Sequence, residues 1–157
     1  MPHTQSQYQV RLSSGTDASV NADIECWADA FQLHDAPQGA RLVTLRNRGA
    51  VARAILAEQE RRNARTSVVV RVAPSQHEGA LAVANLAVAG ALVDALTELG
   101  IDHTSPEAAL AASAWLGIAP VRRHLLGAST DGRMAAERLG VDAVREALEL
   151  DADSAAS

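Results

Sequence analysis

The sequence is poor in the features that mark secreted, disulfide-bonded or nucleic-acid-binding proteins. Its single cysteine, Cys26, excludes an internal disulfide. Lysine is absent, so all 14 basic residues are arginine, and 19 acidic residues outnumber them to give a net charge of −5. Nonspecific nucleic-acid binding depends on a basic surface. The charge balance therefore argues against a nucleic-acid partner.

Long hydrophobic runs and targeting signals are also lacking. The most apolar stretch, residues 80–93, has Asn85 as its single polar residue and ends at Asp94. A transmembrane helix needs about 20 apolar residues, so this stretch is predicted to be a helix buried against a sheet. The first residues, M-P-H-T-Q-S-Q-Y, do not place a basic segment before an apolar one, as a secretory signal would. We expect no membrane partner and a reducing, cytoplasmic location.

Several catalytic motifs are missing as well. The sequence has no G-x-S-x-G elbow, no H-E-x-x-H pair and no P-loop. Cys26 has no histidine near it in the sequence and stands beside Trp27. A lone cysteine in that setting is interpreted as a small packed residue and not as a nucleophile.

The order of apolar and polar residues predicts a single α/β domain over residues 1–157. Residues 8–12 alternate as a half-exposed strand does, and residues 23–27 give a weaker strand signal. Residues 41–45 form a short buried strand, followed by a helix that carries Val51 and Ile55 on one face.

A second strand and helix follow at residues 66–72 and 80–98. Two successive strand–helix units imply parallel strands joined by right-handed crossovers, with 41–45 and 66–73 as neighbours. Beyond Gly100 the chain is predicted to be helical, with helices beginning near Ser105, Ser129 and Gly140. Residues 150–157 are expected to fray. The predicted fold is thus a small, mostly parallel sheet with crossover helices and a helical C-terminal part.

The first turn after a strand offers a candidate anion site. Asn47 stands where the N-cap of the helix is expected, and its side chain could accept a backbone N–H of the first turn. Arg46 and Arg48 flank it. A helix N-terminus with two guanidinium groups suits a phosphate or sulfonate. The alternative is an ordinary capped helix with solvated arginines.

His77 and Glu78 follow the next strand. Parallel strands end at the same edge of a sheet, so this loop and the Asn47 turn are expected to line one crevice, where open α/β sheets bind ligands. Together they could hold a phosphate ester and a hard divalent cation, with Glu78 as metal ligand or base. An exposed loop without a ligand is the alternative.

Five stretches resemble, in order, the magnesium-dependent 2-phosphosulfolactate phosphatases. They are Y-Q-V-R-L at 8–12, T-L-R-N-R-G-A-V-A-R-A at 44–54, S-P-E-A-A at 105–109, Gly132-Arg133, and E-L-D at 149–151. The resemblance implies Mg²⁺ as cofactor and a small phosphorylated or sulfonated acid as substrate. It further implies Asp29 and Glu78 as metal ligands or catalytic groups beside His77, and Arg46, Asn47 and Arg48 as substrate-binding residues.

The departures from that family bear directly on function. The chain is shorter, lacks a central segment that the family carries, and has A-P-S-Q-H-E-G where the family carries a G-E-R…D-G loop, so one expected glutamate is missing. Three hypotheses follow: a working phosphatase, a relative that kept the fold and an anion pocket but lost catalysis, and a helical interaction protein. The small apolar residues around the helix at 80–93 also leave open a homo-oligomer in which a second subunit covers part of that helix.

Overall fold

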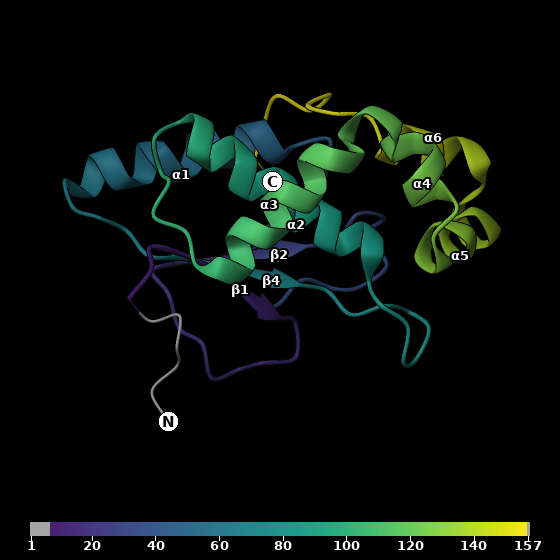
Figure 1. The fold of residues 1–157 in the computed structure, drawn as a ribbon, viewed down its shortest axis with the longest axis horizontal. Coiled ribbons are helices and arrows are strands. Elements are labelled where there is room, and N and C mark those ends of the chain that lie inside the picture. The colour runs from purple at the N-terminus through teal and green to yellow at the C-terminus, as the bar shows by residue number, and fades with distance from the viewer. Residues whose placement is uncertain (1–6, 157) are drawn as a thin grey trace.

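A computed structural model describes residues 7–156, in which four short strands form one parallel sheet (Figure 1). Every paired strand runs parallel to its neighbour, in the order β1-β4-β2-β3. The strands are β1 (Val10–Ser14), β2 (Ile24–Ala28), β3 (Arg41–Val43) and β4 (Val68–Val72). The predicted α/β class with a parallel sheet is confirmed.

The expected neighbours, β3 and β4, are parallel but not adjacent, because β2 lies between them. Ile24 pairs in register with Val68, and Cys26 pairs with both Val70 and Arg41. The β2 segment gave a weak sequence signal because Glu25 interrupts its apolar run. In the fold that carboxylate lies 3.1 Å from the Arg71 guanidinium of β4, so the two charges form an ion pair between neighbouring strands.

Six α-helices and a 3₁₀ turn complete the described part of the chain. They are α1 (Arg48–Arg62), α2 (Val83–Glu98), α3 (Pro106–Ile118), η1 (Ala119–Val121), α4 (Arg122–Gly127), α5 (Thr130–Leu139) and, as a short last helix, α6 (Val141–Ala147). Ser105 and Ser129 act as N-caps, and their hydroxyl oxygens accept from Ala108 N at 3.2 Å and Gly132 N at 3.1 Å. The predicted helix starts at these serines are confirmed.

The helices α1, α2 and α3 cover one face of the sheet, with α2 in the middle (Figure 1). A Cβ atom at Gly90 of α2 would overlap the Ala111 carbonyl oxygen of α3, so the close crossing of these helices requires glycine. The small residues on every side of α2 are therefore covered within one chain, by the sheet, α1 and α3. Among the described residues, no helix combines the length and the apolar character that crossing a bilayer demands.

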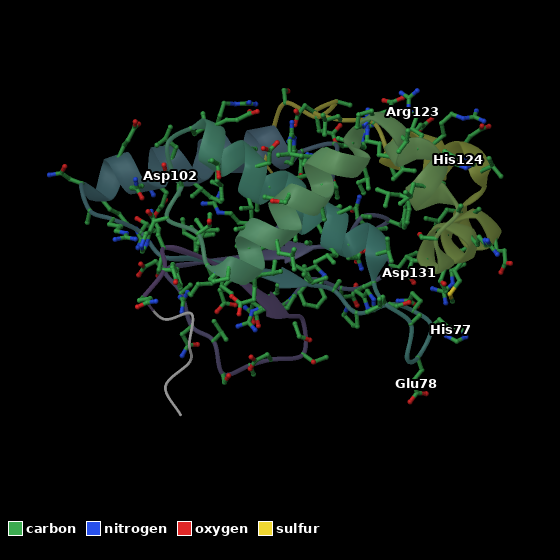
Figure 2. The ribbon with its side chains drawn as sticks, viewed as in Figure 1. His77, Glu78, Asp102, Arg123, His124 and Asp131 are labelled. Carbon is green, nitrogen blue, oxygen red and sulfur yellow. The ribbon has the colours of Figure 1, made fainter. Side chains whose placement is uncertain are left out.

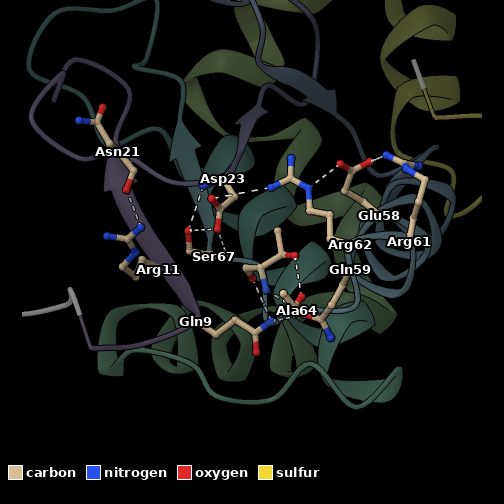
Figure 3. Close-up of polar contacts among 11 residues, drawn as sticks. Gln9, Arg11, Asn21, Asp23, Glu58, Gln59, Arg61, Arg62, Ala64 and Ser67 are labelled. Carbon is tan, nitrogen blue, oxygen red and sulfur yellow. Dashed lines mark hydrogen bonds and ion pairs between the residues drawn. The ribbon is translucent and has the colours of Figure 1, made fainter.

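The opposite face of the sheet is covered by the loop of residues 15–23 instead of a helix. The buried Arg71 donates to the carbonyl oxygens of Val20 (2.7 Å) and Asp17. Arg11 of β1 donates to Asn21 O at 2.7 Å, as Figure 3 shows. Parallel sheets need both faces covered. Here two arginines hold a loop in place to meet that need.

Candidate functional site

The connections that leave β1 and β4 go to opposite faces of the sheet. After β4 the chain enters α2 on the helical face, whereas after β1 it enters the 15–23 loop on the other face. The chain then returns from α2 to the outer side of β1, where Thr104 bridges Val10. Adjacent parallel strands whose connections diverge in this way open a crevice at their carboxyl ends, the usual ligand site of open α/β sheets.

A groove of about 530 Å³ lies at that position. Its walls are Leu12, Ser13, Ser14, residues 72–75, residues 80–83, Leu86 and Glu107. The lining is mainly aliphatic, and its polar side chains are three serines and the Glu107 carboxylate. Among residues 7–156, no arginine or histidine lines it. Leu81 is 84% exposed at its rim, so the groove opens to solvent with an apolar lip.

None of the six predicted site residues lines this groove. His77 and Glu78 lie at the exposed tip of the loop between β4 and α2, and Glu78 points away from the rest of the molecule (Figure 2). Within residues 7–156, the hydrogen-bond partner of the His77 ring is the neighbouring Glu78 carbonyl oxygen, at 3.0 Å. Within the described residues, no side chain from another helix or strand hydrogen-bonds to His77 or Glu78.

Asp29 lies at the end of β2 and is buried. One carboxylate oxygen accepts from Leu33 N at 3.3 Å and the other from His34 N at 2.9 Å, so the side chain closes the turn after the strand. Within residues 7–156, no three His, Cys, Asp or Glu side chains gather in a way that could hold a metal ion. Asp29, committed to two backbone donors, and the exposed Glu78 do not fit a Mg²⁺ site.

Asn47 occupies the N-cap position of α1, but its side chain does not cap the helix. Its Oδ1 accepts from Thr44 N at 2.8 Å, and its Nδ2 donates to Leu42 O at 3.1 Å. The predicted capping bond is wrong because the amide turns back and closes the tight turn between β3 and α1.

The anion position at the start of α1 is filled by the chain's own Asp151. Its Oδ1 accepts from Gly49 N at 2.9 Å, and its Oδ2 lies 3.4 Å from the Arg48 Nε. Arg48 also pairs with Asp94 at 3.3 Å and lies 5.7 Å from the Trp115 ring centre. Arg48 was expected to be solvated or to bind a ligand. It instead links α1 to α2 and to the C-terminal segment.

Arg46 is engaged by the same segment. Its guanidinium lies 2.8 Å from Asp153 and 3.3 Å from Glu149. Hydrogen bonding between Arg46 and Asp153 raises the pKa of the arginine and lowers the pKa of the carboxyl. Asp151 N also donates to Leu45 O at 3.0 Å and Asp153 N to Arg46 O at 2.9 Å. The prediction of a frayed tail is therefore wrong at residues 151–153, which dock beside the β3–α1 turn.

Sequence reasoning missed the residue that joins the strand ends beside the groove. Asn85 of α2 is buried; its Oδ1 accepts from Ala30 N at 2.8 Å, and its Nδ2 donates to Ala73 O at 2.9 Å. It thus ties the carboxyl ends of β2 and β4 to α2. The available signal was its position as the single polar residue in an apolar helix, since a buried amide needs partners.

Asp131 was also missed, and it fixes the loop that forms one wall of the groove. This buried side chain in the first turn of α5 accepts from Ser75 Oγ at 2.8 Å and Gln76 N at 2.9 Å (Figure 2). The His34 ring, from the β2–β3 loop, lies 2.7 Å from Pro74 O. The polar residues at this sheet edge therefore position backbone segments.

Comparison of the chain with protein-family models, curated proteins and solved structures found no match.

Proposed function

We propose that the chain is a non-catalytic relative of the 2-phosphosulfolactate phosphatases that binds a small molecule with an apolar body in the groove between β1, β4, α2 and α3. The observation that carries the proposal is the groove itself: an aliphatic cavity of about 530 Å³ at the point where the β1 and β4 connections diverge. Its volume falls in the range of roughly 300–1,000 Å³ that small-molecule sites occupy. The kinship with the phosphatases rests on the ordered sequence resemblances alone.

The loss of catalysis is inferred from what the expected catalytic residues contact. Asp29 accepts two backbone N–H groups, and Arg46 and Arg48 pair with acidic residues of the same chain. Within residues 7–156, Glu78 belongs to no group of three His, Cys, Asp or Glu side chains that could hold a metal ion. Electrostatic catalysis needs such groups preorganised around the reacting atoms. Asp29, Arg46 and Arg48 instead make their hydrogen bonds and ion pairs with other parts of the same chain.

The lining of the groove specifies the kind of ligand. Aliphatic side chains from Leu12, Val72 and Leu86 would pack against an apolar body. The serine hydroxyls can donate or accept, and the Glu107 carboxylate accepts from a hydroxyl or amine. The described lining holds no cation to neutralise a phosphate or sulfonate, and the Glu107 carboxylate would repel either. The proposed ligand is therefore neutral or an amine, in place of the small acid that the sequence resemblance implied.

A neutral fluorescent probe tests this assignment. N-phenyl-1-naphthylamine has an apolar body and one N–H donor, and its emission rises when it leaves water. We expect saturable binding to the wild type and at least about a tenfold loss of affinity in Ser14→Phe, whose ring would fill the groove. The matched control Ala57→Phe adds the same ring on an exposed position of α1. Equal binding by both variants would refute the groove site.

The catalytic hypothesis has its own test. A panel of phosphate esters that includes 2-phosphosulfolactate is assayed with and without Mg²⁺, in wild type and Glu78→Gln. We expect no hydrolysis above the buffer rate in either protein. Magnesium-dependent turnover that disappears in Glu78→Gln would show that the chain is an enzyme and would overturn the non-catalytic assignment.

A further inference from the structure

A second cavity lies between the three C-terminal helices. Figure 1 shows α4, α5 and α6 packed together at one end of the molecule, away from the strands. Between them lies a pocket of about 360 Å³. Its apolar lining consists of Gly127, Ala136, Val141, Val144 and Leu148, of which Val144 and Leu148 are buried and form the floor. The volume lies within the range of roughly 300–1,000 Å³ that small-molecule sites occupy.

The charged side chains that line this pocket are all arginines. Arg123 comes from α4, Arg133 from α5 and Arg145 from α6, and no carboxylate of residues 7–156 lines the pocket. In a chain whose acidic residues outnumber its basic ones, this lining concentrates positive charge. Guanidinium groups offer planar sets of N–H donors that match a carboxylate, sulfonate or phosphate. The pocket therefore combines an apolar floor with a cationic rim.

The three arginines of the rim are only partly engaged by the chain itself. Arg133 Nε donates to Ala128 O at 3.1 Å. Arg145 lies 3.1 Å from Asp142, in an ion pair whose side chains are 65% and 89% exposed. Exposed pairs of this kind contribute little, so Asp142 does not satisfy Arg145. Within residues 7–156, the Arg123 guanidinium has no ion-pair partner. The rim thus keeps cationic groups that a ligand can use.

The helices around the pocket are held together by contacts that no ligand needs to supply. Arg122, next to Arg123, donates to Leu148 O at 2.9 Å and so joins the start of α4 to the end of α6. A Cβ atom at Gly132 would overlap the Leu126 carbonyl oxygen, so glycine lets α5 lie close against α4. Binding to a preformed pocket loses less conformational entropy than binding to a mobile one.

We propose that this pocket binds an amphiphilic organic anion, with its apolar body against Val144 and Leu148 and its carboxylate, sulfonate or phosphate group at the three arginines. An inorganic anion gains nothing from the apolar floor and stays hydrated, whereas a neutral apolar molecule leaves the guanidinium groups without a partner. The groove beside β1 and β4 is a separate cavity, and its charged side chain is Glu107. The proposal therefore goes beyond the proposed function and does not depend on it.

A pair of fluorescent probes separates the two cavities, because 8-anilinonaphthalene-1-sulfonate is N-phenyl-1-naphthylamine with an added sulfonate. We expect saturable binding of the sulfonate probe to the wild type and at least about a tenfold loss of affinity in Arg123→Gln/Arg133→Gln. Ser14→Phe, which fills the groove, should leave this binding unchanged, and the neutral probe should respond the other way round. The matched control Arg53→Gln/Arg61→Gln removes two exposed arginines of α1 and should bind like the wild type. Equal affinity of the two double variants for the sulfonate probe would overturn the proposal.

A second variant tests the cavity without changing its charge. A Cβ atom at Gly127 would meet, among the described residues, Leu148 Cδ1 at 4.0 Å and nothing closer, so Gly127→Leu adds a side chain that can enter the pocket. It should also weaken the sulfonate probe at least about tenfold, with circular dichroism melts to verify folding. Unchanged affinity would show that the probe binds elsewhere and would refute the site. Inorganic phosphate at millimolar concentration should not displace the probe, and displacement would overturn the assigned ligand class.

Discussion

Asn47 and Asn85 are buried amides that each satisfy two backbone groups. Such side chains act as local cross-links, and three of these four hydrogen bonds are buried, so their backbone partners would have no water to replace the amide. An unsatisfied buried donor or acceptor costs about 1–3 kcal/mol. The two asparagines are therefore expected to matter for stability whether or not a ligand binds.

We predict that Asn85→Ala lowers the free energy of unfolding by about 2 kcal/mol, since it leaves the Ala30 N–H and the Ala73 C=O unpaired in the core. Urea titration followed by circular dichroism measures the change. Ser113→Ala, on the exposed side of α3, serves as control and should change stability by less than about 0.5 kcal/mol. Equal effects of the two substitutions would contradict the role assigned to Asn85.

The surroundings of Cys26 decide the reactivity of its thiol. It is fully buried in β2, and burial raises the pKa of its thiol to about 12. Because the thiolate is the reactive form, we predict that a disulfide reagent such as 5,5′-dithiobis(2-nitrobenzoate) does not modify the folded protein at pH 8. The same reagent should modify one thiol per chain in denaturing urea. Rapid reaction of the folded protein would show that β2 is accessible.

At the scale of elements, the C-terminal segment supplies the negative charge that α1 needs at its start. Asp151 accepts the Gly49 N–H, and Asp153 and Glu149 neutralise Arg46. Helix N-termini favour anions by roughly 0.3–1 kcal/mol at exposed positions. The segment thus occupies the position that a bound phosphate was expected to take.

We predict that phosphate or sulfate does not raise the melting temperature of the wild type beyond the general salt effect. In the double variant Asp151→Ala/Asp153→Ala, the Gly49 N–H loses its acceptor and Arg46 and Arg48 each lose one acidic partner, so phosphate should stabilise that variant. Asp142→Ala, at an exposed ion pair in α6, is the control and should not gain phosphate sensitivity. Phosphate stabilisation of the wild type equal to that of the double variant would show that the segment does not fill the site.

The docking of this segment should also depend on pH. The hydrogen bond from Arg46 lowers the pKa of Asp153 below its ordinary value of 3.8. A carboxyl with a lowered pKa in the folded state contributes its full stabilisation above the ordinary value and loses it as the pH falls through the lowered one. The difference in melting temperature between wild type and Asp153→Asn is therefore expected at pH 7 and should shrink near pH 3. A constant difference over this range would indicate that the charge of Asp153 contributes nothing.

At the scale of the whole molecule, local patterns predicted the elements and long-range contacts decided their arrangement. The strand–helix units at 41–62 and 66–98 could be predicted because apolar periodicity is a property of neighbouring residues. The place of β2 could not be predicted, since the ion-pair partner of its Glu25 is Arg71 on β4, 46 positions away. The roles of the arginines were hidden for the same reason: Arg46 and Asp153 are 107 positions apart. No spacing within one segment reveals such a pair.

The two faces of the sheet should differ in stability, and the two tryptophans lie where they can report it. Trp115 belongs to α3 on the helical face. Trp27 pairs in register with Arg71 on the other face and lies close under Gly15 of the covering loop, where a Cβ atom would come within 3.0 Å of its ring. That loop is fixed by the hydrogen bonds of Arg71 to Val20 and Asp17, whereas the helical face is held by a continuous apolar core.

We predict that Arg71→Met loosens the loop-covered face while the helical face stays packed. Methionine keeps the length of the side chain but cannot donate to the Val20 and Asp17 carbonyl oxygens. In a Trp115→Phe background, acrylamide should quench Trp27 several-fold more strongly once Arg71 is replaced. In a Trp27→Phe background, the quenching of Trp115 should not change. An equal rise for both tryptophans would mean that Arg71 supports the fold as a whole, and no rise for Trp27 would mean that apolar packing alone holds the loop.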